Sequence, residues 1–222
     1  MSPSAIKFIT FDCYGTLTHF QISGMTRSLL ADRINSSEMD AFVTDFAAYR
    51  RDEVLGPWKP YRDVLQTALA RTCNLWGIAH RPQDGEAMYQ AVPTWGPHPD
   101  VAEPLVQLAR KIPLVILSNA ANDQIMHNVE KLKAPFHAVY TAEQAGAYKP
   151  RLAAFDHMFD ELGCSPADVA HVSASMRYDL ISAHDLRIPT RIYVNRGYEP
   201  SAPYYSTAEI SGIGELAGVL GL

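Results

Sequence analysis

Short apolar runs alternate with longer amphipathic segments from Pro97 onward. Short runs bounded by turn residues indicate buried strands, and apolar positions three or four residues apart indicate helices. The expected strands are residues 113–117, 137–141, 169–172 and 190–194, and the expected helices lie near 100–111, 122–133, 151–162, from about 179, and near 213–220. Strands that alternate with helices predict a parallel sheet with right-handed crossovers.

One further strand is expected near the start of the chain. Residues 7–11 (KFITF) form a β-favouring run that stops at Asp12 and passes into Tyr14, Gly15 and Thr16, which predict a turn. Asp12 is therefore expected at the C-terminal edge of a strand. Ligands bind at this edge in open α/β sheets, so an acidic residue there is better placed for chemistry than for packing.

The stretch from about residue 20 to 95 has a helical pattern that no strand signal interrupts. Ser36 and Ser37 are the expected N-cap of one helix, and another helix is expected to close on Gly77. Such a block predicts an inserted domain. We therefore predict an α/β fold made of a Rossmann-like parallel-sheet core (residues 1–17 and 97–222) and an inserted helical cap domain (residues 18–96).

Composition and charge narrow the class of protein. Of the 222 residues, 47% are apolar and 19% charged, so the chain can bury a core. The net charge of -5 and the lack of a basic run argue against nucleic acid as a partner. No apolar run reaches about 18 residues and the first residues do not resemble a signal peptide, so we expect no membrane segment and a cytoplasmic location. The three cysteines lack paired spacing and are expected to be buried thiols.

Reactive side chains are expected at or just beyond the C-terminal ends of several strands, namely Asp12, Ser118 with Asn119, Lys149, and the loop from Ser173 to Asp179. These ends converge in a doubly wound sheet, which would bring two carboxylates, an ammonium and small hydrogen-bonding groups together. A carboxylate at Asp12 can attack an electrophilic carbon or phosphorus. Lys149 is expected to keep it ionised by lowering its pKa, and Ser118 with Asn119 can grip a substrate carboxylate or phosphate.

Each of these residues also has an ordinary structural interpretation. An Asp at a strand end is a turn or cap residue in about half of cases, and a Ser-Asn pair there is more often a cap than a ligand clamp. Asp179 fits a helix cap as well as it fits a site residue, and a Lys before Pro is commonly a solvated loop charge. Their joint occurrence, in order and at strand ends, favours an active site.

The same residues form an ordered set of motifs that resembles the haloacid dehalogenase superfamily along essentially the whole chain. The motifs are FDCYGTL at residues 11–17, ILSN at 116–119, YKP at 148–150 and HVSASMRYD at 171–179. The helical block is similar to the small cap that such enzymes carry after the first motif. The resemblance implies a hydrolase that acts through a covalent intermediate on its aspartate.

Two positions distinguish the dehalogenases from the phosphatases of this superfamily. Phosphatases usually carry a second Asp two residues after the nucleophile as a general acid, and this position is Tyr14 here. They also hold magnesium with an acidic residue that opens the fourth motif, and this position is Ala174 here. The resemblance is therefore to the type II, or L-2-haloacid, dehalogenases, whose halide leaves without a proton, and neither a metal nor a cofactor is expected.

The resemblance also implies the roles of individual residues in the core: Asp12 as nucleophile, Lys149 as its charge partner, Tyr14 and Thr16 as site-lining residues, Ser118 and Asn119 as the clamp for the substrate carboxylate, Asp179 as the residue that orients the hydrolytic water, and Ser175 as a neighbour of that water. Two of the three departures from the family pattern lie in the core. The Tyr usually found several residues after the third-motif Lys is Phe155, and the fourth motif has Ala174 and Met176 at positions that are usually polar.

In the cap, the Arg that receives halide in such dehalogenases aligns with Arg50 or Arg51, although the spacing fits Ala48 equally well. Trp58 and Tyr61 are candidates for covering a small substrate, while packing is the commoner role of cap aromatics.

In the core, His171 is expected to be a buried histidine with satisfied hydrogen bonds rather than a general base.

The expected function is hydrolysis of a small 2-substituted carboxylic acid, with an (S)-2-haloacid as the leading substrate and an aspartyl ester as the intermediate. The motif HVxxSxxxD, with the cap segment PWKPYRDVL, resembles a branch that includes azetidine-2-carboxylate hydrolase, which is the first alternative. The others are a metal-dependent phosphatase and a non-catalytic protein that binds a small acid. The resemblance also makes a homodimer an expectation.

Overall fold

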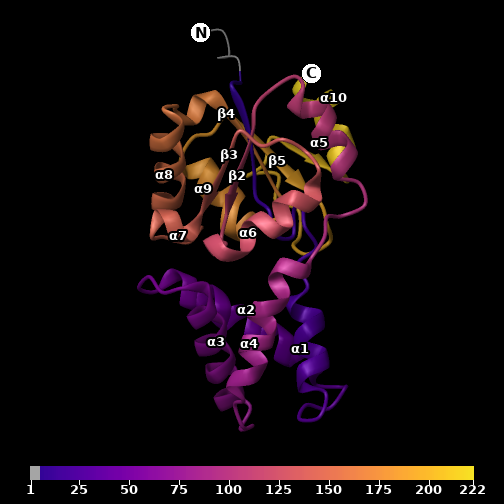
Figure 1. Cartoon of the computed structure of the whole chain (residues 1–222), viewed down its shortest axis with the longest axis vertical. Helices are drawn as coiled ribbons and strands as arrows, with labels where there is room; N and C mark the ends of the chain where they lie inside the picture. Colours follow the sequence, from indigo (N-terminus) through magenta and orange to yellow (C-terminus); the bar gives the residue numbers. More distant parts are fainter. Residues whose placement is uncertain (1–5) are drawn as a thin grey trace. The chain divides into compact units, whose positions relative to one another are not determined.

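The computed structural model describes residues 6–222, and these form two compact units (Figure 1). Of the described residues, 6–19 and Gly96–Leu222 form one unit, the core, and Phe20–Trp95 form the other, the cap. The cap was expected at residues 18–96, which differs from the observed cap by two residues at its start and one residue at its end.

The core contains a six-stranded sheet in which all neighbouring strands are parallel, in the order β3-β2-β1-β4-β5-β6. Its strands are β1 (Phe8–Phe11), β2 (Leu114–Ser118), β3 (Ala138–Thr141), β4 (Val169–Ser173), β5 (Thr190–Val194) and β6 (Ala208–Ile210). The strand order reverses between β1 and β4, because the chain builds outward through β2 and β3 before it crosses to the other side of β1. Open α/β sheets bind ligands at the C-terminal strand ends beside such a point.

Helices cover both faces of this sheet. They are α5 (Ala102–Ala109), α6 (Asn122–Val129), α7 (Ala142–Ala145), α8 (Leu152–Leu162), α9 (Ile181–Asp185) and α10 (Leu216–Leu220), with 3-10 turns at Glu130–Leu132, Pro166–Asp168 and Ile213–Glu215 and a π-helical turn, η4, at Met176–Leu180. Alternate strand residues point to opposite faces. Ile9 and Phe11 pack with buried residues of α5, α6 and α10, whereas Val115 and Leu117 pack with α8 and α9. The two helical layers lie on either side of the sheet in Figure 1.

The cap is helical throughout its regular structure. It contains α1 (Ile22–Leu30), α2 (Met39–Leu55), α3 (Tyr61–Leu75), α4 (Pro82–Ala91) and a 3-10 turn at Val92–Thr94. Phe42 and Phe46, one turn apart on α2, are fully or almost fully buried, as are Leu65 and Leu69 on α3. Because α2 packs on α3 and α3 on α4, these stripes give the cap an apolar interior of its own.

The structure corrects three expectations about the elements. The serine N-cap was wrong, because Ser36 and Ser37 lie in a turn, and α2 begins at Met39 without a side-chain cap. The helix expected from about Asp179 begins instead at Met176, with the π-helical turn. Strand β6 was not expected, because three residues are too few for an alternating pattern to be recognised.

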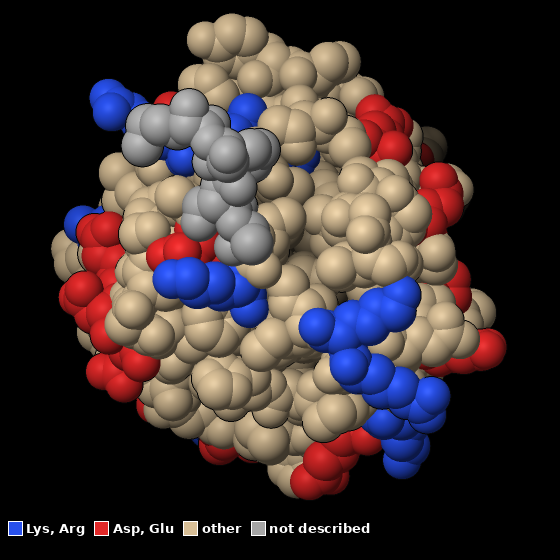
Figure 2. Space-filling model, turned by 90° about the horizontal axis from the view of Figure 1, so that it is seen from above, with Lys and Arg blue, Asp and Glu red and all other residues tan. Residues whose placement is uncertain are grey.

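No helix within residues 6–222 combines the length and the apolar character that crossing a bilayer needs. Figure 2 shows the molecule from above, where Lys and Arg side chains form separate groups among uncharged surface and acidic side chains. Both signs of charge are therefore present on this face.

Candidate active site

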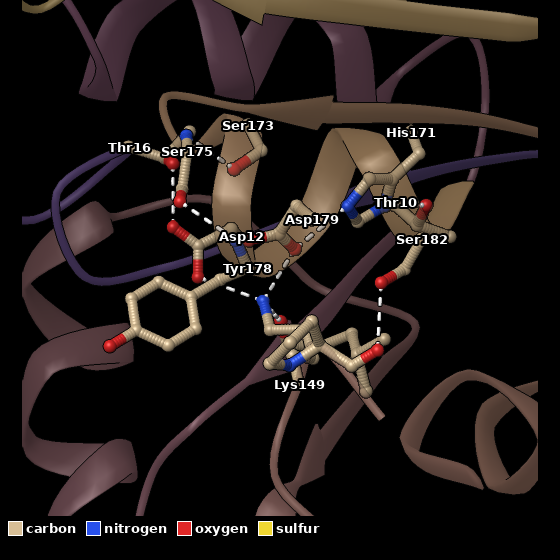
Figure 3. Close-up of polar contacts among 12 residues, drawn as sticks. Thr10, Asp12, Thr16, Lys149, His171, Ser173, Ser175, Tyr178, Asp179 and Ser182 are labelled. Atoms are coloured by element: carbon tan, nitrogen blue, oxygen red, sulfur yellow. Dashed lines mark hydrogen bonds and ion pairs between the residues drawn. The ribbon is translucent and has the colours of Figure 1, made fainter. Parts of the chain in front are cut away.

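The C-terminal ends of the central strands bring the predicted reactive residues together. Asp12 directly follows β1, Ser118 ends β2, and Asp179 lies in the turn after β4. Lys149 comes from the loop before α8, and its side chain reaches the same place (Figure 3). This convergence follows from the parallel register, because Phe11 pairs with Ile116 on one side and Val172 on the other, so that all three strands end at one edge.

Lys149 is the centre of the site. Its Nζ donates hydrogen bonds to Asp12 Oδ1 at 3.0 Å, to Asp179 Oδ1 at 2.6 Å and to the carbonyl oxygen of Leu117 at 2.7 Å. An ammonium has three hydrogens, so all of them are used. The side chain is 1% exposed, and such a charge is stable in the interior only because two carboxylates surround it.

Asp12 is held by both of its carboxylate oxygens. Lys149 binds Oδ1, and the hydroxyl of Thr16 donates to Oδ2 at 2.6 Å. The same Thr16 hydroxyl accepts a hydrogen bond from the backbone N–H of Ala174 at 2.9 Å, which ties the loop after β1 to the loop after β4. The carboxylate therefore has a fixed orientation, as a nucleophile requires.

The three charges do not balance, because two carboxylates face one ammonium. Burial opposes the charge of Asp179, but Lys149 and His171 outweigh burial and lower its pKa. Burial raises the pKa of Asp12 above its ordinary 3.8, against the opposing effects of Lys149 and Thr16. Lys149 itself has a raised pKa, because the two carboxylates outweigh the effect of burial. Asp12 is thus the carboxylate whose charge is less compensated.

This result corrects one sequence expectation. Lys149 was expected to lower the pKa of Asp12, and its charge does act in that direction. The net direction was wrong, because the desolvation of a carboxylate at a buried strand end is larger than the attraction to an ammonium that it shares with Asp179.

His171 and Thr10 form a polar pair beneath Asp179. His171 is fully buried on β4, with its Nε2 2.9 Å from Asp179 Oδ1 and its Nδ1 2.8 Å from the hydroxyl of Thr10 on β1. The sequence prediction of a buried histidine with satisfied hydrogen bonds agrees with this geometry. Its contact with Asp179 was not foreseen. Phe155, the departure from the family's Tyr, packs edge-on against the His171 ring with the centroids 5.2 Å apart.

Ser175 lies at the start of the π-helical turn. Its hydroxyl accepts from the N–H of Tyr178 at 3.1 Å and donates to Glu199 Oε1 at 3.0 Å. The other oxygen of Glu199 accepts from the N–H groups of Met176 and Arg177. Glu199 therefore fixes the loop that carries Asp179. The predicted role of Ser175 beside a water molecule stays a prediction.

Ser118 and Asn119 differ sharply in their surroundings. Asn119 uses its side-chain amide to bind the backbone of Lys149, as acceptor at 2.7 Å and donor at 2.9 Å. Ser118 is 1% exposed, and its hydroxyl has no hydrogen-bond partner. A buried hydroxyl without a partner is costly, which makes Ser118 the better candidate to bind a substrate atom.

Tyr14 points its hydroxyl toward Asn128, to which it donates at 2.8 Å.

Within the cap, the structure brings two of the four predicted residues together. The guanidinium of Arg50 lies 5.2 Å from the ring centres of both Phe20 and Phe46. Tyr61 is a hydrogen-bond partner of Arg50, and burial raises the pKa of its hydroxyl. The aromatic rings surround Arg50 with apolar groups, and in such a setting the attraction between its charge and an anion is stronger.

The other two predicted cap residues are Arg51 and Trp58. Arg51 is half-buried on α2, turned by about 100° from Arg50 around the helix axis. Trp58 is 37% exposed in the connection between α2 and α3.

Comparison with known proteins identifies the family. The sequence model of the haloacid dehalogenase-like hydrolases matches residues 6–186. The chain belongs to this family. It is also 28% identical, over 179 residues, to the (S)-2-haloacid dehalogenase of Xanthobacter autotrophicus, covering 77% of this chain and 68% of that protein.

Solved structures confirm the fold. An L-2-haloacid dehalogenase superposes with a TM-score of 0.83 at 20% identity, covering 99% of this chain and 100% of that one. The dehalogenase from Xanthobacter autotrophicus with chloropropionic acid covalently bound has a TM-score of 0.77 at 20% identity, covering 97% and 98%. A hydrolase of the same superfamily from Bacillus subtilis, bound to magnesium, has a TM-score of 0.82 at 15% identity, covering 99% and 100%.

The residues of this site do not fit a magnesium ion. The Lys149 ammonium contacts both carboxylates, where a cation would have to bind. Position 174, expected to carry the acidic ligand, is alanine, and residues 6–222 contain no group of three or more His, Cys, Asp or Glu side chains arranged to hold a metal.

Sequence reasoning missed two supporting residues. Glu199 caps the turn before Asp179, and Arg196 donates two hydrogen bonds to the carbonyl oxygen of Thr16 while its third nitrogen binds Asp100. Both lie beyond β5 in a segment without regular structure. Their positions in the sequence do not indicate these contacts, because only the folded sheet brings the segment after β5 beside the loops that follow β1 and β4.

The buried charges predict the effect of Lys149→Met on stability. The substitution leaves two carboxylates in the interior without their cation, so the free energy of unfolding at pH 7 should fall by about 3–5 kcal/mol. Urea unfolding followed by circular dichroism measures this loss. The loss should shrink as the pH is lowered, because the unpaired carboxyls take up protons in the folded state. The double variant Lys149→Met, Asp179→Asn is the control and should recover part of the stability; an equal loss at all pH values would contradict the argument.

Proposed function

We propose that this hydrolase is a 2-haloacid dehalogenase in which Asp12 attacks the halogen-bearing carbon. One observation carries the proposal: Asp12 is buried, oriented by Lys149 and Thr16, and followed two residues later by Tyr14 in place of an acid. The hydroxyl of Tyr14 is directed to Asn128. Such a site favours a leaving group that needs no proton, and halide is one. The (S)-2-haloacid dehalogenase relative supports the same choice.

The first half of the proposed reaction forms an ester. A carboxylate oxygen of Asp12 attacks C2 of the haloacid, the new C–O bond forms as the carbon–halogen bond breaks, and the electron pair of that bond leaves with the halide. The less compensated charge of Asp12 suits this step, because alkylation removes that charge and leaves Lys149 balanced by Asp179 alone. The charges of the site are therefore better matched in the ester than in the free enzyme.

The second half releases the product. Water adds to the carbonyl carbon of the Asp12 ester, Asp179 accepts one proton of this water, and the bond from that carbon to the substrate oxygen breaks. Asp179 then returns the proton to the leaving oxygen, which gives the 2-hydroxy acid, and the second proton is lost as Asp12 ionises again. Asp179 lies next to this reaction, because Lys149 Nζ contacts both carboxylates.

The substrate carboxylate is proposed to bind at the end of β2. The support is the unpartnered hydroxyl of Ser118, which can donate to an anionic oxygen. Asn119 contributes mainly by holding the backbone of Lys149 in place. In the cap, Arg50 is the proposed anion-binding residue, while Trp58 and Tyr61 stay candidates for covering a small substrate.

Substrate assays with Asp12→Asn test the proposed chemistry. The wild-type protein should release chloride from L-2-chloropropionate, and the variant should be slower by at least about 10⁴-fold, because it lacks the nucleophile. A single turnover in heavy-oxygen water should place the label on Asp12, measured by mass spectrometry of the peptide that contains it.

The same assay tests the alternative functions with other substrates. Azetidine-2-carboxylate and a phosphate monoester with magnesium are run in parallel. Ring opening without chloride release would replace the proposed leaving group with an amine, and phosphate release that requires magnesium would refute the proposal. Binding of 2-chloropropionate with no turnover would indicate a non-catalytic protein.

The raised pKa of Asp12 predicts the acid side of the pH profile. The nucleophile must be deprotonated, so kcat/KM for L-2-chloropropionate should fall as the pH drops through a value above 3.8. Thr16→Val should move this fall to still higher pH, because the Thr16 hydroxyl bond lowers the pKa of Asp12. Initial rates between pH 4 and 9 measure both. A fall in the variant at lower pH than in the wild type would be inconsistent with Asp12 as the titrating group.

Two neighbouring arginines of α2 provide a matched pair. Arg50→Ala should lower kcat/KM about 10- to 100-fold, the value of a charge-assisted hydrogen bond to the substrate or its leaving group. Arg51→Ala should change it by less than about twofold, because the two side chains point in different directions. The measurement is chloride release at low substrate concentration. Equal effects of the two substitutions would remove Arg50 from the proposal.

A further inference from the structure

His171 and Thr10 form a polar pair in the core beneath Asp179. They are partners in the register of β1 and β4, and both are fully buried. The face of the sheet on this side is lined by apolar residues such as Phe155 and Met158. Burying two polar side chains here is unfavourable unless each is hydrogen-bonded. Apolar residues of similar size would fill the same space, so packing alone does not require this pair.

The hydrogen bonds of the pair lead to Asp179. The Nε2 of His171 faces Asp179 Oδ1 at 2.9 Å, and a carboxylate oxygen is an acceptor, so Nε2 carries the hydrogen. The Nδ1 lies 2.8 Å from the Thr10 hydroxyl, which is closer than the 3.3 Å from that hydroxyl to the carbonyl oxygen of Ala170. The Thr10 hydroxyl thus contacts both Nδ1 and the backbone of β4, and this contact holds the ring with Nε2 directed to Asp179.

Asp179 consequently has one occupied oxygen and one open oxygen. Its Oδ1 accepts from both Lys149 and His171, at 2.6 and 2.9 Å (Figure 3). Its Oδ2 is buried and has no hydrogen-bond partner. Two donors from different elements, the loop before α8 and strand β4, fix the carboxylate more strictly than one donor would, because rotation of the group would break both bonds.

From this geometry we infer that His171 is a positioning residue for the hydrolytic half of the reaction, acting through Asp179. The inference rests on the proposed function. The ring fixes Oδ1, so that Oδ2 stays in place to accept the proton of the water that attacks the Asp12 ester. Thr10 fixes the ring. His171 does not contact Asp12, so the first half, in which halide leaves, is independent of it.

The test separates the two halves of the reaction. His171→Phe keeps an aromatic ring against Phe155 but removes the Nε2–H donor. The steady-state kcat for L-2-chloropropionate should fall on the order of 10- to 100-fold, the usual effect of removing a supporting partner. The rate of chloride release in the first turnover should equal that of the wild type. The Asp12 ester should accumulate, which rapid quench and mass spectrometry of the intact protein would detect.

Two further variants distinguish positioning from packing. His171→Gln restores an N–H donor near the position of Nε2 and should recover much of the lost kcat. Phe155→Leu disturbs the packing around the ring without removing the hydrogen bond, and should not make the ester accumulate. Equal slowing of both halves in His171→Phe, without rescue by Gln, would overturn the inference, because packing then accounts for the effect.

The failure of the inference is distinguishable from the failure of the proposed function. If the wild-type protein releases no halide and forms no ester on Asp12, the proposed function fails and the inference falls with it. If the wild type forms the ester and His171→Phe hydrolyses it at the wild-type rate, only the inference fails.

Discussion

The contact of Lys149 with two buried carboxylates is the interaction on which the site depends. One ammonium cannot fully compensate two negative charges in a buried site. The imbalance falls on Asp12, because Asp179 has the shorter contact with Lys149, and Lys149 and His171 together lower the pKa of Asp179. The excess charge is thus located on the residue that is proposed to lose it by forming an ester.

The surroundings of these charges are built in layers. Thr16 and Asn119 hold Asp12 and the backbone of Lys149 directly. Behind them, Glu199 fixes the turn that carries Asp179, and Arg196 fixes the carbonyl oxygen of Thr16. Most of these contacts involve backbone groups or loop residues at the C-terminal edge of the sheet. The positions of the site residues therefore depend on the parallel register of the strands from which these loops extend.

Two buried polar atoms of the site lack hydrogen-bond partners, and each has a proposed role in one half of the reaction. The Ser118 hydroxyl is open at the end of β2, where a substrate carboxylate is proposed to bind, and Asp179 Oδ2 is open where a water molecule is to be deprotonated. Buried polar atoms are normally satisfied, so we propose that the substrate and the water complete the hydrogen bonding of these two atoms. Asn119 fills a supporting role because its amide is already used twice.

The sequence by itself determined the alternation of strands and helices, the helical insertion, and the residues Asp12, Lys149 and Asp179, because period, turn residues and motif order are local properties. The tertiary structure decided the rest. The net direction of the Asp12 pKa depends on burial, and the link from Thr10 through His171 to Asp179 depends on strand register; neither is encoded in spacing. Glu199 gave no signal, since a side chain that acts across a sheet edge is identified only when distant segments meet.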